Sequence, residues 1–488
     1  MELELVLSPA AASRLPHLKL LAPLKQGRAR NRPVRIVWHD SPDAALAADG
    51  LALAERREGW QLERMYPGRD LWPPATPAPV LREARDRASL GDDALPETLV
   101  PTASFAGRAL GLSLLVENEA MELTLLSGTI RGVVDEHQAA RLLISGPARE
   151  TVRLALILAD ELPLSVPRAS LAGEAISVAR GIVPAPRRIG APAVPDGVSV
   201  ADAFAHLAGH LTDVILHWAP IAAAGEGGPE PVHQMRVGVR RLRSVLSVFR
   251  SATACPTIAE AAAGLKALGA VLGPARDWDV FTAGIGARVA TAFPEERAMV
   301  RLMEAAERHR RQGYADLRRF IDDPAFRLLG IRLAALSAAR LWEQEIDDAE
   351  RTVLATPLTD FAVAALNRRL KRMVAPGNDI AHMEPEALHI IRLRAKRLRY
   401  AAEFFAPLFP GKATRRFTRR LSQLQEELGL LNDGTVAAGL LAQLPGGGAE
   451  RAFAIGLVRG FVAAASNTAR KEIVEVWRDF RKQEPFWT

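Results

Sequence analysis

The sequence contains a single cysteine, Cys255, among 488 residues, so no disulfide can form within the chain. This composition fits a reducing compartment. No Cys/His motif surrounds Cys255, and we expect a small buried side chain rather than a nucleophile. The amino terminus has no basic region followed by an apolar core, and no run approaches 18 apolar residues. We therefore expect a soluble, cytoplasmic protein without a secretory signal or a membrane span.

Acidic residues are missing from two stretches that are otherwise rich in charge. No Asp or Glu occurs from His233 to Arg250 or from His389 to Ala402. An exposed helix face usually mixes both signs, because acids three or four residues from Lys or Arg neutralise them. Residues 1–200 hold 23 Lys and Arg against 24 Asp and Glu, so the excess of positive charge lies in residues 201–488. We expect an anionic partner in that second part.

The two acid-free stretches are copies of each other. Subtracting 156 from the residue number places His389, Arg392, Lys396 and Arg399 on His233, Arg236, Arg240 and Arg243. The same offset relates Phe405 to Phe249, Gly429 to Gly273 and Asp433 to Asp277. An ungapped correspondence over some 45 residues indicates an internal duplication.

On a helix, the cations of each copy lie on one side. Ile391, Leu398 and Phe405 fall on a narrow apolar arc, and the cations fall on another arc about 80° wide. We call His233, Arg236, Arg240 and Arg243 basic stripe 1, and His389, Arg392, Lys396 and Arg399 basic stripe 2. Arginines on successive turns suit a linear chain of tetrahedral anions, because each guanidinium can bind two oxygens.

The candidate anion-binding residues include both stripes and cations near them. They are His233, Arg236, Arg240, Arg241, Arg243, His389, Arg392, Lys396, Arg397 and Arg399, followed by Lys266, Arg276, Arg416, Arg419 and Arg420. A second cluster, Arg368, Arg369, Lys371 and Arg372, fits an ordinary surface equally well. The alternative for the stripes is a solvated basic face paired with acids from other helices. Each histidine could instead cap or orient its helix, and Asp277 and Asp433 could cap helices or orient arginines. Neither histidine has metal-site spacing to other ligands.

Short strands separated by turn signals dominate the first 180 residues. We expect strands at Glu2–Leu7, Val34–Trp38, Leu51–Arg56, Gln61–Met65, Ser113–Val116, Met121–Leu126 and Arg141–Ile144, then a helix at Thr151–Leu162. Residues 67–101, rich in Pro, Arg and Asp, read as a long mobile insertion. Residues 183–198 read as a linker because prolines and glycines recur without periodicity.

Residues 199 onward read as helices. The first is expected at Ala201–Ala219 and ends at Pro220, and the helix at Ile258–Leu272 is closed by Gly273-Pro274, with Asp277 capping the next one. The remaining helices are expected at Val232–Ser251, Glu295–Ile321, Pro324–Trp342, Pro357–Met373 and Thr414–Leu431, with a second motif helix and a last pair ending near Phe480. About ten duplicated helices favour two packed bundles.

The duplicated motif resembles the CHAD domain, the conserved-histidine α-helical domain. The resemblance rests on His389-Ile-Ile-Arg392-Leu-Arg394-Ala-Lys396-Arg397-Leu398-Arg399-Tyr400 and on Leu428-Gly429-Leu430-Leu431-Asn432-Asp433. It implies two four-helix bundles whose basic faces line a central groove, and binding of inorganic polyphosphate there.

The first part resembles the triphosphate tunnel metalloenzymes, which include the CYTH domains. That family opens with E-x-E-x-K, and here Glu2 and Glu4 are followed by Val6 in place of Lys. Leu142 and Leu171 stand where a metal carboxylate and another Lys are expected, whereas Arg56 is retained. Hydrolysis of a triphosphate needs metal carboxylates and several converging cations. The resemblance therefore implies a degenerate, inactive domain in which Glu2 and Glu4 are the only candidate metal ligands.

These observations predict an α+β chain of two domains. Residues 1–182 would form a degenerate antiparallel β-barrel or sheet of the tunnel type, and residues 199–488 an all-α, duplicated pair of four-helix bundles with repeats at about 201–350 and 357–488. The leading hypothesis is a non-catalytic polyphosphate-binding protein, recruited to polyphosphate granules, without a cofactor. The alternatives are an inorganic triphosphatase that uses a divalent cation and a non-specific nucleic-acid binder. Base recognition needs stacking or groove-reading side chains, which the stripes lack.

Overall fold

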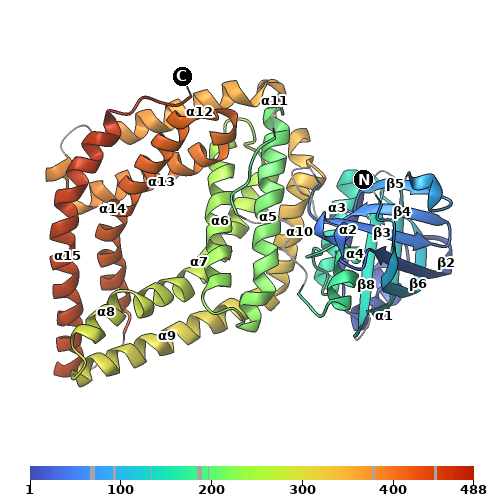
Figure 1. Cartoon of the computed structure of the whole chain (residues 1–488), viewed down its shortest axis with the longest axis horizontal. Coiled ribbons are helices and arrows are strands. Elements are labelled where there is room, and N and C mark those ends of the chain that lie inside the picture. Colours follow the sequence, from blue (N-terminus) through green and yellow to red (C-terminus); the bar gives the residue numbers. More distant parts are fainter. Residues whose placement is uncertain are drawn as a thin grey trace.

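The structure is a computed structural model that describes residues 1–65, 72–91, 95–132, 135–183, 190–195, 197–375, 380–444 and 448–487. Within these ranges the side chains of residues 381, 385, 430–433 and 465–471 are not described. The chain folds into an N-terminal part built on a β-sheet and a C-terminal part built only from helices, as Figure 1 shows. The predicted α+β, two-domain class is confirmed.

The N-terminal part is a curled antiparallel sheet of eight strands in the order β1-β8-β7-β6-β2-β3-β4-β5. Because β1 and β5 are the two ends of this order, the sheet is a half-barrel rather than a closed barrel. The strands are β1 (Glu2–Val6), β2 (Lys25–Asp40), β3 (Leu51–Arg56), β4 (Gly59–Arg64), β5 (Val80–Ala84), β6 (Val100–Val116), β7 (Glu119–Arg131) and β8 (Glu136–Ser145). Four helices accompany them: α1 (Pro9–Arg14), α2 (Ala45–Ala48), α3 (Ala148–Glu161) and α4 (Leu171–Ala179).

A tight hairpin joins the two long central strands β6 and β7. Glu117 and Asn118 form its turn with φ values of 51° and 71°, the left-handed backbone that a two-residue hairpin turn requires. Beyond this turn, Val116 pairs with Glu119 and the register continues to Ser104 and Arg131. Alternate residues of the strands are buried on one face, where α3 covers the sheet.

Each expected strand overlaps an observed one, although Glu2–Leu7 and Gln61–Met65 extend one residue beyond β1 and β4, and the prediction of an insertion was only partly correct. Residues 80–84, inside the expected insertion 67–101, form β5, which pairs with β4. Strand β5 is exposed along most of its length and follows a proline-rich segment, so neither burial nor alternation marks it in the sequence. Several strands are also longer than expected, because exposed polar residues such as Arg28 and Arg30 extend β2.

The C-terminal part contains eleven α-helices in the region that the structure describes. They are α5 (Val200–Ala224), α6 (Glu230–Phe249), α7 (Pro256–Ala283), α8 (Ile285–Ala292), α9 (Arg297–Asp322), α10 (Pro324–Ala338), α11 (Asp348–Ala355), α12 (Leu358–Val374), α13 (Pro385–Phe405), α14 (Lys412–Ala442) and α15 (Ala449–Arg481). Helix α6 packs against α5 and α7, and its copy α13 packs against α12 and α14. Figure 1 shows the helices as a frame whose corners include an α6–α13 contact and an α9–α15 contact.

Two helix ends that the sequence predicts at prolines are wrong. Helix α5 continues through Pro220 to Ala224, and α7 continues through Pro274 to Ala283. Asp277 therefore lies inside α7 and does not cap a following helix. A proline inside a helix costs a backbone hydrogen bond. At α7, long buried faces on both sides of the proline hold the helix together: Leu268 and Leu272 precede it, and Trp278 and Phe281 follow.

Aromatic side chains of both repeats share one core. The ring of Phe249 lies 5.5 Å from Phe204, 5.0 Å from Phe361 and 6.2 Å from its repeat counterpart Phe405. Aromatic pairs at such distances add to the free energy of burial. This cluster fixes the crossing of α6 and α13, and with it the positions of the two basic stripes.

The far side of the helical frame is closed by a separate apolar cluster. Trp278, Phe281 and Leu302 from α7 and α9 pack with Leu440 and Val458 from α14 and α15. A cavity of about 220 Å³ lies in this contact, lined by Phe281, Arg288 and Phe461 among others, and the Arg288 guanidinium lies 4.8 Å from the Phe461 ring centre. The two repeats therefore meet at two corners rather than along a continuous interface.

One described stretch is long and apolar enough to cross a membrane, namely residues Pro256–Ala292, which comprise α7 and α8. Length and composition alone select it, and a core helix of a soluble protein passes the same test. Ile258, Leu265 and Leu272 of this stretch are buried in the helical core, which is compatible with a soluble protein. Cys255, just before it, is buried as expected, and burial raises the pKa of its thiol to about 11.

Candidate anion-binding site

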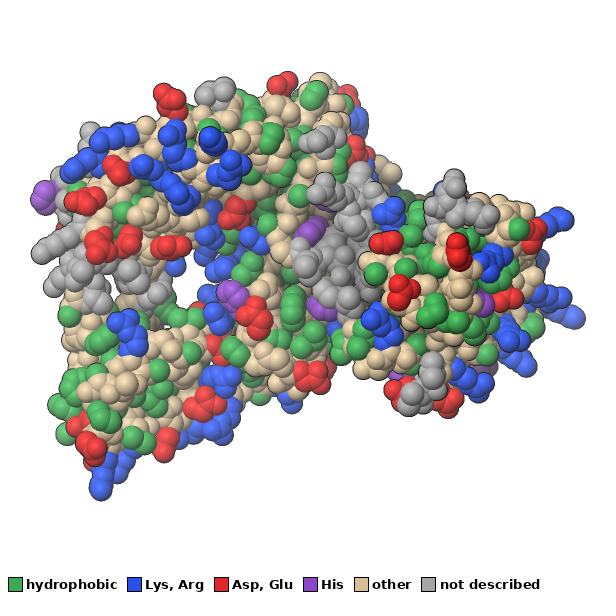
Figure 2. Space-filling model, in the orientation of Figure 1, with side chains coloured by type: hydrophobic (Ala, Val, Ile, Leu, Met, Phe, Trp, Pro, Cys, Tyr) green, Lys and Arg blue, Asp and Glu red, His purple; other side chains and the backbone are tan. Residues whose placement is uncertain are grey.

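The two stripe helices are anchored by their opposite faces. Met235, Val239 and Leu242 of α6 are fully or almost fully buried, as are Ile391, Ala395 and Leu398 of α13. In each helix, residues at i, i+4 and i+7 face the core, so the cations between them are turned toward the other side. Figure 2 shows that the space inside the helical frame is hollow, with Lys and Arg side chains along its upper and right-hand rim.

Arg236 of basic stripe 1 is held against α7. Its Nη1 lies 2.9 Å from Oδ1 of Asp277 and donates to the carbonyl oxygen of Gly273 at 3.0 Å. Asp277 thus orients an arginine, one of the two roles that the sequence left open for it.

Glu403 connects the two stripe helices. Its Oε2 accepts a hydrogen bond from Nη2 of Arg241 at 3.1 Å, and its Oε1 lies 3.4 Å from Nε of Arg399. All three side chains are mostly buried, with exposed fractions from 18% to 26%. A single carboxylate therefore serves one arginine from each repeat, which leaves their combined charge positive.

Lys396 lies in the most positive part of the site. Burial, together with the charges of Arg240, Arg392, Arg236 and Arg399, lowers the pKa of its ammonium to about 7. Two of these arginines come from α6 and two from α13, so the two stripes converge. Burial likewise lowers the pKa of Arg240, whose neighbours include the same arginines and the hydroxyl of Tyr400.

The two histidines differ in their surroundings. His233 lies half-buried near the start of α6, and burial lowers its pKa, with Arg276 of α7 as the next largest cause. Arg276 therefore faces basic stripe 1, as expected for a neighbouring contact. His389 is exposed in the first turns of α13. A titrating histidine beside arginines fits an anion site better than a metal site.

The remaining predicted cations lie less centrally. Arg243, Lys266, Arg397, Arg416 and Arg419 are exposed. Arg243 lies beside Gly269 of α7, where a Cβ would be 3.9 Å from its Nη1. Arg420 points to α15, where its Nη1 lies 3.3 Å from Oδ2 of Asp479. The side chain of Asp433 lies outside the described residues.

In the N-terminal part, the candidate metal ligand Glu4 forms an ion pair with an arginine. Nε of Arg141 lies 3.4 Å from Oε1 of Glu4, and the same guanidinium binds Glu174 of α4. Arg141 and Glu4 are both buried, with side chains 3% and 9% exposed. Glu2 accepts a hydrogen bond from the hydroxyl of Ser145 at 2.8 Å. Among the described residues no group of three His, Cys, Asp or Glu side chains could hold a metal ion.

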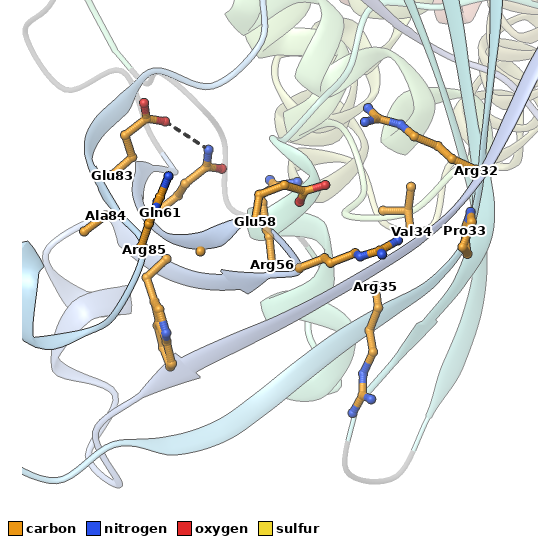
Figure 3. A pocket seen from close by; sticks show the side chains of 13 residues that line it. Arg32, Pro33, Val34, Arg35, Arg56, Glu58, Gln61, Glu83, Ala84 and Arg85 are labelled. Atoms are coloured by element: carbon orange, nitrogen blue, oxygen red, sulfur yellow. Dashed lines mark hydrogen bonds between the residues drawn. The ribbon is translucent and has the colours of Figure 1, made fainter.

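A second concave region lies at the β3–β4 end of the sheet. A cavity of about 570 Å³ is lined there by Arg32, Arg35, Arg56 and Arg85, together with Glu58 and Glu83, and Figure 3 shows these side chains. Arg56, which the tunnel-family resemblance singles out, donates from Nη2 to Oε1 of the buried Glu63 at 2.6 Å. Its charge is thus neutralised within the sheet, like that of Arg141.

Sequence reasoning missed two residues of the helical site. Glu403 follows the acid-free stretch at once and lies four residues after Arg399, so helix spacing was a usable signal for that pair. Its bond to Arg241 could not be predicted without knowing how α6 and α13 cross. Tyr400, buried beside Arg240, carries no signal beyond its apolar position.

Comparisons with known proteins show what the helical part is similar to. The family model described as the CHAD domain matches residues 204–442. Two curated relatives, uncharacterized proteins from two strains of Mycobacterium tuberculosis, are each 33% identical over 182 residues. That match covers 36% of this chain, and the chain spans about a third of the length of these relatives, 34%.

Solved structures resemble the chain over a larger share. The crystal structure of the CHAD domain from the plant Ricinus communis covers 62% of this chain and 98% of its own, with 27% identity and a TM-score of 0.52. PptA from Streptomyces chartreusis is similar at 17% identity and a TM-score of 0.44, covering 58% of this chain and all of its own (100%).

Proposed function

Residues 204–442 form a CHAD domain, a family associated with polyphosphate binding, and on this basis we propose that the chain binds inorganic polyphosphate along its two basic stripes. The polyphosphate would lie in the space that the helical frame encloses, with its phosphoryl groups against α6 and α13. The N-terminal part would take no catalytic role in this function.

The observation that supports the proposal most directly is the surroundings of Lys396. Its ammonium is mostly buried beside four arginines from two helices, and burial together with their charges lowers its pKa to about 7. Burying like charges together is unfavourable unless a counter-charge is present. A polyanion supplies that charge, and each guanidinium can bind two of its oxygens. The free protein would therefore hold a preformed but electrostatically strained site, and ligand binding would relieve the strain.

Polyphosphate fits this surface better than nucleic acid. Nearly every unit of polyphosphate is charged, so contacts made only by Arg, Lys and His can follow its whole length. Single-stranded nucleic acids are held largely by aromatic stacking. Tyr400, which directly follows Arg399 of basic stripe 2, is buried and so offers no exposed ring to a base. A non-specific nucleic-acid binder remains the alternative outcome of the test below.

The ion pairs of the N-terminal sheet argue against a triphosphatase. Arg141 binds the carboxylate of Glu4, one of the two candidate ligands for a divalent cation, and Arg56 is neutralised by Glu63. Val6, Leu142 and Leu171 replace further charged positions of the tunnel family. We expect no release of phosphate from tripolyphosphate in the presence of Mg²⁺. Clear Mg²⁺-dependent turnover would make the chain a triphosphatase, with the helical part as its substrate collector.

The test compares the affinities for long-chain polyphosphate and duplex DNA at about 150 mM salt, where non-specific contacts weaken. The variant changes His389, Arg392, Lys396 and Arg399 together to Ala. As a matched control, Arg28, Arg30 and Arg108 on the exposed sheet surface are changed to Ala, which removes the same three formal charges as the stripe variant does. Circular dichroism and thermal unfolding check that each variant is folded.

We expect tight polyphosphate binding by the wild type and the control, weaker DNA binding by both, and at least a tenfold loss of polyphosphate affinity in the stripe variant. Equal affinity for both polymers would identify the stripes as a generic polyanion surface. Unchanged binding by the stripe variant would overturn the proposal. In cells, we expect a fluorescent fusion of the wild type to collect at polyphosphate granules and the stripe variant to stay diffuse.

A further inference from the structure

The contact between α6 and α13 is not symmetric, although the two helices are copies. Arg241 of α6 binds Glu403 of α13. The offset of 156 relates Arg241 to Arg397 and Glu403 to Ser247. A symmetric contact would therefore pair Arg397 with a carboxylate at position 247, where the chain has an exposed serine. The second copy of the contact has kept its arginine and has no acid.

Another arginine occupies the neighbourhood of that serine. Nη2 of Arg369, on α12, donates to the carbonyl oxygen of Ser247 at 3.1 Å, and its Nη1 donates to the carbonyl oxygen of Ala365 at 3.3 Å. Burial lowers the pKa of Arg369 to about 10, and the further causes are the charges of Arg368, Arg372 and Arg397. The guanidinium of Arg369 therefore lies at the last turn of α6, within electrostatic range of the other three arginines.

No carboxylate neutralises this arginine cluster among the described residues. Every described ion pair of α12 and α13 involves Glu403, and the charged groups that shift the pKa of Arg369 are all cations. The carbonyl group of Ser247, near the C-terminal end of α6, supplies partial negative charge, which offsets part of the repulsion. It carries no formal charge, so the cluster retains its excess. Figure 2 shows Lys and Arg side chains gathered over the upper helices, where α12 and α13 lie.

Arg397, the member of the cluster on α13, points in a different direction from basic stripe 2. Arg397 follows Lys396 directly, and consecutive residues of a helix point about 100° apart. Guanidinium forks that lie close together suit an oxyanion with several charged oxygens. We propose that Arg368, Arg369, Arg372 and Arg397 form a second binding site for phosphoryl anions, at the position where the repeat symmetry lacks a carboxylate. This site does not require the stripes to bind polyphosphate.

The symmetry supplies its own test, because Ser247→Glu restores the missing acid. We expect this change to neutralise Arg397 and Arg369 and to weaken anion binding at the cluster about tenfold or more. Ser247→Gln is the matched control of equal size without charge, and it should bind like the wild type. Arg397→Ala is an independent variant that should weaken the same site. It provides the test in case the glutamate at position 247 disturbs α6. Thermal unfolding checks all three.

The probe is tripolyphosphate, titrated by calorimetry at about 50 mM salt, where phosphate contacts are strong. Tripolyphosphate has only three phosphoryl groups and is too short to occupy both sites at once. The number of bound equivalents therefore gives the number of sites. In the stripe variant described above, we expect binding to remain at the cluster and to be lost on adding Ser247→Glu. If the stripe variant binds no tripolyphosphate, or if Ser247→Glu binds as well as Ser247→Gln, the second site does not exist. Neither result would affect the proposed polyphosphate function.

Long-chain polyphosphate then distinguishes two sources of the anion. If Ser247→Glu also lowers the affinity for the long chain, one polymer occupies both the stripes and the cluster. If the long-chain affinity is unchanged while a tripolyphosphate equivalent is lost, the cluster takes a separate small phosphorylated ligand. Both results support the site, and they differ only in what occupies it.

Discussion

Arg241 and Glu403 form an ion pair with 3.1 Å between Nη2 and Oε2, although they lie 162 residues apart in the chain. The pair joins α6 to α13, and the other oxygen of Glu403 lies beside Arg399. Glu403 therefore has two opposite effects. It stabilises the crossing of the two repeats, and it withholds two arginines from a bound anion.

We expect Glu403→Gln to bind polyphosphate more tightly and to be less stable. The glutamine removes one negative charge from the site, which should raise the affinity about fivefold, a change of ~1 kcal/mol for a partly screened charge. Loss of a largely buried ion pair should lower the free energy of unfolding by about 1–2 kcal/mol. Binding titrations and urea unfolding measure the two effects. Glu304→Gln, an exposed change in the middle of α9, should alter neither; weaker binding by Glu403→Gln would contradict the role of the carboxylate.

In the N-terminal part, we expect Glu4→Gln to destabilise the sheet without changing polyphosphate binding. The change leaves the buried guanidinium of Arg141 with Glu174 as its remaining carboxylate, and breaking a buried pair from one side costs about 3 kcal/mol. Chemical unfolding followed by tryptophan fluorescence measures it. Glu2→Gln removes a carboxylate that is exposed to solvent and should cost less than about 0.5 kcal/mol. Equal stability of the two variants would mean that Arg141 is satisfied without Glu4.

A periodic pattern in the sequence predicts which cations share one face of each stripe helix. The duplication and the helical spacing locate both stripes, and the structure brings Arg236 and Arg240 within electrostatic range of Lys396. Two interior prolines mislead the prediction of helix ends, because Pro220 and Pro274 are tolerated within helices that are held by tertiary packing. Local sequence penalises such a proline, but only the fold shows what compensates for it.

Long-range pairs could not be predicted from the sequence in this way. The bond of Arg241 to Glu403 depends on how two helices cross, and that crossing is fixed by rings such as Phe249 and Phe405. In the sheet, the sequence shows Leu142 in place of a metal carboxylate, and only the structure shows that the charge of the adjacent Arg141 binds Glu4. Strand β5 is exposed on most of its length, so the alternation that marks a half-buried strand is missing there.

The free protein should become more stable as the pH rises from about 7 toward 10. The pKa of Lys396 is about 7 in the folded chain and near the ordinary lysine value of 10.5 when the chain is unfolded. Between these values the unfolded state binds more protons, so the free energy of unfolding increases with pH; below pH 7 both states are protonated and this contribution is constant. Urea unfolding at about pH 7, 8 and 9 measures the increase in the free energy of unfolding. Lys396→Met should abolish it, and an unchanged slope in that variant would assign the effect to another group.

Polyphosphate binding should show the opposite dependence on pH, because the ligand favours the charged form of Lys396. In the free protein at pH 8, an ammonium with a pKa of about 7 is mostly neutral. A bound polyanion raises that pKa, so binding takes up a proton and the affinity falls by up to about tenfold per pH unit above pH 7. Below pH 7 Lys396 is already charged and no longer contributes to the pH dependence. Protonation of His233, whose pKa is lowered, then adds affinity as the pH falls further.

Calorimetry in two buffers of different ionisation enthalpy measures the proton uptake directly. Lys396→Arg keeps the charge at all these pH values and should flatten the profile above pH 7; equal proton uptake by that variant and the wild type would show that Lys396 is not the group that titrates.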